Sequence, residues 1–152
     1  MKSQPGGDSN QGALLDEQWR AVLLHRTDGD GSRQTAARRF AEQGIGPEQV
    51  RAVLADGGDA LYAAAASGRH GWADAFGGPL AVALLSAEVG ILAAHLNSRA
   101  SGVRSMAVAE LLDEYSAVTV AGELGVARQK VYEIARPGLR PPYIEQVPWR
   151  TT

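Results

Sequence analysis

Apolar residues recur along this chain with the spacing of helices rather than of strands. Four of them follow the i, i+4, i+7, i+8 pattern of a surface helix over residues 13–26: Leu15, Trp19, Val22 and Leu23. Turn-forming residues at 27–32 end this helix. Three shorter helices are predicted to follow, over 33–43, from Pro47 to the turn at 56–58, and over 59–66.

The longest apolar run covers residues 80–96 and carries a single formal charge, at Glu88. A membrane-spanning helix needs about 20 mainly apolar residues. This run is shorter and contains a glutamate, so we expect a core helix or a helix packed on a second subunit. Leu84, Leu92 and Leu96 are the candidates for such a dimer contact. Glu88 is then either a functional carboxylate or the partner of an arginine across the dimer.

The chain divides into four parts by composition. Residues 1–12 hold little to bury and are expected to form a disordered tail, and 13–102 form a helical, dimerising region that ends at a polar break over 97–102. A module over 103–136 follows. The last part, 137–152, contains four prolines and is predicted to be an extended arm. Either Tyr143 and Trp149 anchor this arm by packing on the protein or on a neighbouring subunit, or its arginines, Arg140 and Arg150, contact the DNA backbone.

Composition supports an all-α protein and excludes several classes of site. The 152 residues include 26 alanines and only 9 aromatic residues, which favours helix over strand. The absence of cysteine excludes disulfides, a thiol nucleophile and a thiolate zinc site. The net charge of −2 argues against bulk binding of nucleic acid, although a local basic face is compatible with it. The first residues do not have the pattern of a signal peptide, so we expect a cytoplasmic protein.

Residues 104–136 can be drawn as three helices, over 105–115, 117–124 and 128–136. Ser116 is a suitable N-cap for the second helix. Two helices that cross after a three-residue turn need a small residue at the crossing and a residue that tolerates positive φ in the turn. Ala121 and Gly125 stand at those positions. Aliphatic residues with matching spacing are expected to form a buried wedge: Val120, Leu124, Val126, Val131 and Ile134.

This pattern resembles the bacterial helix-turn-helix motif, in the form found in resolvase/invertase C-terminal domains and in homeodomain-like repressors. The resemblance covers about 20 residues closely and about 33 with the preceding helix, less than a quarter of the chain. It implies that the third helix enters the major groove of DNA. The side chains expected at base edges are Arg128, Gln129, Tyr132 and Glu133. Those expected at phosphates are Lys130, Arg136 and Ser116.

The function that this resemblance implies is sequence-specific binding of double-stranded DNA by a homodimeric transcription regulator without a cofactor. Two features depart from the family pattern. Ala127 replaces the usual Ser or Thr cap of the third helix, which typically costs about 1 kcal/mol. Residues 103–152 also balance their basic and acidic side chains. The alternative is a helical scaffold whose end binds a protein.

No pattern of an enzyme or a metal site stands out. The sequence lacks a phosphate-binding glycine loop, a nucleophile elbow and paired catalytic acids, so we expect no enzyme. Residues 28–32 resemble the start of a calcium loop, but Arg33 and Arg39 occupy the places of its glycine and glutamate. The three histidines are far apart in sequence, which argues against a metal site.

Overall fold

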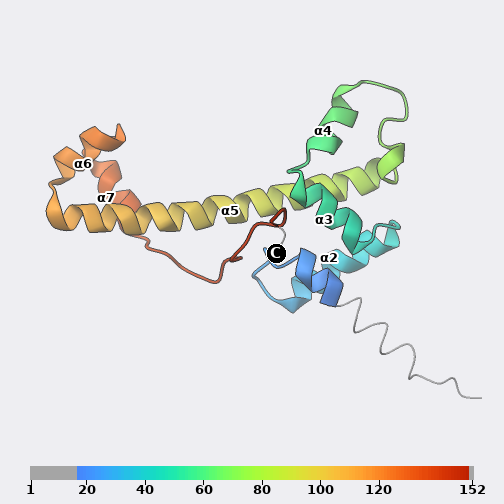
Figure 1. Cartoon of the computed structure of the whole chain (residues 1–152), viewed down its shortest axis with the longest axis horizontal. Coiled ribbons are helices and arrows are strands. Elements are labelled where there is room, and N and C mark those ends of the chain that lie inside the picture. Colours follow the sequence, from blue (N-terminus) through green and yellow to red (C-terminus); the bar gives the residue numbers. More distant parts are fainter. Residues whose placement is uncertain (1–16, 151–152) are drawn as a thin grey trace, which may run out of the picture. The chain divides into compact units, whose positions relative to one another are not determined.

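The computed structural model describes residues 17–150, and this range contains helices and no strands (Figure 1). The all-α prediction is therefore confirmed for the described range. The described residues form two compact units, the first made of 17–92 with 144–150 and the second of Ala93–Tyr143. The predicted tail at 1–12 and the first turn of the helix predicted over 13–26 lie outside the described residues.

The first unit begins with helical residues 17–22, which are followed by α2 (Asp30–Glu42), α3 (Pro47–Ala55) and α4 (Asp59–Ala66). α2 starts earlier than predicted, because Asp30 places a carboxylate in the first turn, where the helix dipole favours negative charge. α3 starts at Pro47 as expected. The helix that follows the turn at 56–58 was also predicted correctly.

The core of the first unit is built on apolar residues of α2 and α3. Trp19 stacks on Phe40 with ring centroids 5.8 Å apart. Val50, Val53 and Leu54 of α3 are buried. In α2, Ala36 and Phe40 are buried, whereas Ala41 is exposed.

α5 (Pro79–Glu114) is a single helix of 36 residues, reached through a loop with a 3-10 turn at Asp74–Phe76. The polar break predicted at 97–102 was wrong, since polar side chains on the helix surface do not interrupt the backbone hydrogen bonds of a helix. The helix predicted separately over 105–115 is the end of α5. Both compact units take part of this helix, because they divide between Leu92 and Ala93.

The first half of α5 packs in the core of the first unit. Ala81, Leu85 and Leu92 are buried there, so Leu92 is not available for the dimer contact expected of it. α5 is long and apolar enough to cross a membrane by length and composition, with a mean hydropathy of 1.7 over its most apolar window. Within this helix the Glu88 carboxylate is buried and pairs with His25 and Arg26 of the same unit.

Candidate nucleic-acid interface

The second unit contains the tight connection between α6 (Ala117–Leu124) and α7 (Arg128–Ala135), and both helices match the predicted bounds closely. Ser116 caps α6, because its Oγ accepts a hydrogen bond from the Thr119 amide at 3.1 Å. Gly125 ends α6 in the left-handed conformation with φ 69°. A side chain at that position would be strained, so glycine is required for the turn.

One apolar core joins α6 and α7 to the last turns of α5. Its buried members are Val108, Val120, Ala121, Val131 and Ile134, and Leu112, Val126 and Ala135 pack against them. Leu124 was wrongly placed in this wedge, since 42% of it is exposed. Leu124 continues the apolar stripe of α6, but it lies in the last turn, where the chain leaves the helix toward α7.

The core leaves the opposite side of α7 exposed. We call the four side chains that line an open pocket on this side, Arg128, Gln129, Tyr132 and Arg136, the α7 face. The pocket has a volume of about 500 Å³. No acidic side chain of the described residues forms an ion pair with Arg128 or Arg136, so both guanidinium groups can accept an external anion.

The remaining predicted contact residues lie beside the α7 face. Lys130 and Glu133 are exposed and form an ion pair with an N···O distance of 3.7 Å. A pair this exposed contributes little and opens readily, so Lys130 can still reach a phosphate. The Ser116 hydroxyl is occupied by the cap of α6 and by a hydrogen bond to the Thr119 Oγ1. Ser116 is therefore less suited to a phosphate than the sequence suggested.

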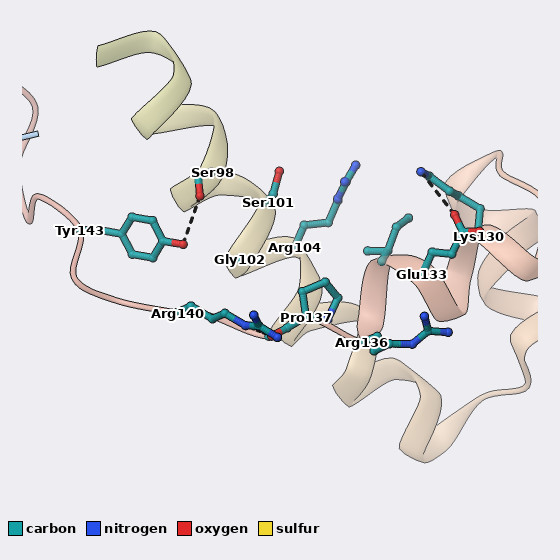
Figure 2. A pocket seen from close by; sticks show the side chains of 12 residues that line it. Ser98, Ser101, Gly102, Arg104, Lys130, Glu133, Arg136, Pro137, Arg140 and Tyr143 are labelled. Atoms are coloured by element: carbon teal, nitrogen blue, oxygen red, sulfur yellow. Dashed lines mark hydrogen bonds and ion pairs between the residues drawn. The ribbon is translucent and has the colours of Figure 1, made fainter. Parts of the chain in front are cut away.

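The chain after α7 folds back onto the second half of α5. Ser105 of α5 is 1% exposed. Its Oγ donates to the Ala135 carbonyl at 3.1 Å and accepts from the Gly138 amide at 2.7 Å. The Tyr143 and Ser98 hydroxyls lie 3.3 Å apart (Figure 2), and the Tyr143 ring packs edge-on against His95. We call residues 137–143, which these contacts position, the return arm.

A buried ionic cluster in the first unit was not found from the sequence. Glu88 accepts hydrogen bonds from Arg26 and contacts His25, with shortest distances of 2.8 and 2.6 Å. Burial raises the pKa of the Glu88 carboxyl, but the hydrogen bonds and charges of His25 and Arg26 outweigh this effect and hold the pKa below its ordinary value.

This cluster corrects the expectation that Glu88 faces an arginine across a dimer, because both partners belong to its own unit. Among the described residues no buried side-chain nitrogen or oxygen lacks a hydrogen-bond partner. The buried polar atoms of His25, Arg26 and Glu88 thus have hydrogen-bond partners within the protein, which fits a structural role. The described residues also contain no group of three or more acidic or histidine side chains that could hold a metal ion.

No protein-family model, curated protein or solved structure matches this chain. The functional interpretation therefore depends on the geometry of the second unit.

Proposed function

We propose that the protein binds double-stranded DNA sequence-specifically, with α7 in the major groove. The α7 face carries this proposal. It places two arginines without acidic partners next to an amide and a phenol, on the side of α7 opposite the core. A major groove admits an α-helix, and its base edges offer the acceptors and donors that these groups can pair with.

Each side chain of α7 has a distinct role in this proposal. Arg128, at the first position of the helix, donates two hydrogen bonds to a guanine, and Gln129 pairs in the same way with an adenine. Tyr132 and Glu133 lie one turn further along the helix and contact neighbouring bases. Lys130 and Arg136 neutralise phosphates on either side of the groove.

The expected biological role is transcription regulation by a homodimer. Two copies of α7 about 34 Å apart would reach successive major grooves on one side of the duplex, which requires a pseudo-palindromic site. Sedimentation of the full chain at micromolar concentration tests the assembly. A clean monomer, both alone and with DNA, would contradict the homodimer.

A second candidate function is docking of a protein partner on the same unit. Tyr115 and Val118 are 52% and 66% exposed, and Leu124 is also exposed. Exposed apolar side chains in and beside α6 favour a protein contact more than a phosphate contact. In this case the protein would not bind duplex DNA at low salt.

The experiment that tests DNA binding is fluorescence anisotropy with a random-sequence duplex at low salt, followed by selection of bound sites from a random library. For the selected site, Arg128→Ala should weaken binding by about 1–3 kcal/mol and relax the preference at one base pair. Arg38→Ala is the matched control, because Arg38 is an exposed arginine of α2 in the other unit. Equal binding by Arg128→Ala and the control would reject the assigned role of α7.

A further inference from the structure

A second open pocket lies in the same unit, between α7, the second half of α5 and the return arm. Its volume is about 440 Å³. Arg104 and Ser101 contribute from α5, Lys130 and Glu133 from α7, and Arg140 from the return arm (Figure 2). We call this site the basic pocket.

The basic pocket concentrates positive charge in a chain of net charge −2. Its charged lining residues are Arg104, Lys130, Arg136, Arg140 and Glu133. Glu133 pairs with Lys130, and the charged lining residues together carry a net charge of +3. No acidic side chain of residues 17–150 forms an ion pair with Arg104, Arg136 or Arg140. Three guanidinium groups without an acidic partner thus border one pocket.

Buried and directional contacts hold the elements around this pocket. Ser105 fixes the start of the return arm through its two backbone hydrogen bonds. A Cβ on Gly102 would lie 2.6 Å from Leu139 Cδ1 and 3.3 Å from its Cα, so a larger residue there would require Leu139 and the arm to shift. The Arg140 Nε donates to the Pro137 carbonyl at 3.1 Å, which restrains that side chain. These contacts hold the walls of the pocket in place before a ligand binds, which lowers the entropy cost of binding.

We propose that the basic pocket binds phosphate groups. Guanidinium groups match the oxygen geometry of a phosphate and bind it through paired, charge-assisted hydrogen bonds. In Figure 2 the Arg104 and Lys130 side chains extend from α5 and α7 into the same open region. The Ser101 hydroxyl adds a neutral donor at the wall of the pocket. The phosphate belongs either to the DNA backbone, in which case this inference rests on the proposed function, or to a free phosphorylated molecule.

Arg136 links the basic pocket to the α7 face, because it lines both. An anion held in the basic pocket would compete with DNA for this guanidinium group. Free phosphate ligands are therefore expected to weaken DNA binding more than their contribution to ionic strength predicts.

The first arm of the test measures binding of inorganic pyrophosphate to the full chain by isothermal titration calorimetry and by ³¹P NMR. The double variant Arg104→Ala/Arg140→Ala should bind pyrophosphate at least about tenfold more weakly, since it loses two charge-assisted contacts. Arg38→Ala should bind like the wild type. Circular dichroism confirms that each variant keeps its helices.

The second arm measures the dependence of DNA affinity on salt. If the pocket holds a backbone phosphate, the double variant Arg104→Ala/Arg140→Ala should reduce the slope of log K against log salt by about 0.9, the value for one phosphate, whereas Arg38→Ala leaves it unchanged. Pyrophosphate binding without this change identifies a free ligand as the source. A changed slope without pyrophosphate binding identifies the DNA backbone.

The inference fails if the double variant matches the wild type in both arms. It also fails if the full chain binds no pyrophosphate and no duplex. Pyrophosphate binding by a chain that binds no duplex supports the pocket while rejecting the proposed function. If Arg128→Ala weakens duplex binding, but Arg104→Ala/Arg140→Ala changes neither pyrophosphate binding nor the salt slope, the phosphate site is rejected and the proposed DNA-binding function stands.

Discussion

At the scale of single residues, the most consequential contact is the one that neutralises Glu88 in the core of the first unit. Glu88 is 2% exposed, and Arg26 reaches it with both Nε and Nη2. A buried carboxylate that loses its charged partners is costly, and so is a buried cation that loses its carboxylate. Glu88 therefore connects α5 to His25 and Arg26, which follow the helical residues 17–22.

Replacement of this carboxylate should destabilise the protein strongly. Glu88→Gln leaves His25 and Arg26 without their anion, and we expect a loss of about 3 kcal/mol in the free energy of unfolding, measured by urea denaturation at pH 7. Glu48→Gln is the control, because Glu48 pairs with Arg51 on the exposed surface of α3 and should change stability little. Similar losses for both variants would contradict the importance of the buried cluster.

The same contact predicts a dependence on pH. The pKa of Glu88 is lowered in the folded state, so its stabilisation is present above the ordinary glutamate pKa of about 4.3 and is lost as the pH falls through the folded value. The stability difference between wild type and Glu88→Gln should thus be constant near neutral pH and shrink below about pH 4. A difference that stays constant down to pH 2.5 would show that the charge of Glu88 is not responsible.

Residue-level features were predictable where their partners are close in sequence. Ser116 and Thr119 are three positions apart, and the turn at Gly125 follows from local spacing, so sequence alone indicated both. His25 and Glu88 are separated by 63 positions, and no local pattern connects them. Leu124 shows a further limit, because helical periodicity cannot tell whether another element covers the last turn of a helix.

At the scale of elements, Gly102 explains why the sequence suggested two helices where α5 is continuous. A glycine among polar residues is typical of a helix end. Here Gly102 is buried, and its missing side chain makes room for Leu139 and the Gly138 carbonyl of the return arm. The residue that looked like an interruption thus serves packing between two segments that sequence reasoning could not bring together.

Gly102→Ala separates these two explanations. Alanine favours a helix interior by about 1 kcal/mol over glycine, so an isolated helix would gain stability. In this protein the added Cβ displaces the return arm, and amide hydrogen exchange at residues 137–143 should become faster while exchange in α5 stays slow. Gly90→Ala is the control, since a Cβ there meets no atom within 4 Å. Unchanged exchange in the arm of Gly102→Ala would contradict the described packing.

At the scale of the whole molecule, charge is distributed so that a chain of net charge −2 keeps a local basic surface. The chain has 15 basic and 17 acidic side chains, yet the α7 face and the basic pocket hold arginines without acidic partners in the described range. If the protein binds DNA as proposed, the attraction is local and long-range steering is weak. Under this proposal, affinity depends on base contacts more than it does for a highly basic protein.

The salt dependence of DNA binding tests this distribution. Contacts of Lys130 and Arg136 with two phosphates predict a slope of about −2 per protomer for log K against log salt, and a third phosphate in the basic pocket predicts about −3. Anisotropy titrations between 50 and 200 mM salt with the selected duplex measure this slope. A value steeper than −6 per protomer would mean that cations outside the second unit contact the duplex.

The continuity of α5 also limits how the gene can be divided. Because Leu92 and Ala93 are consecutive residues of one helix, this junction between the units has no loop at which the coding sequence can be divided. A fragment starting at Ala93 would expose uncapped amides at its first turn. One starting a few codons later, at Asn97 or Ser98, would begin with a residue type that caps helices well. Expression screens and chimaeric fusions of the second unit should therefore place their start there.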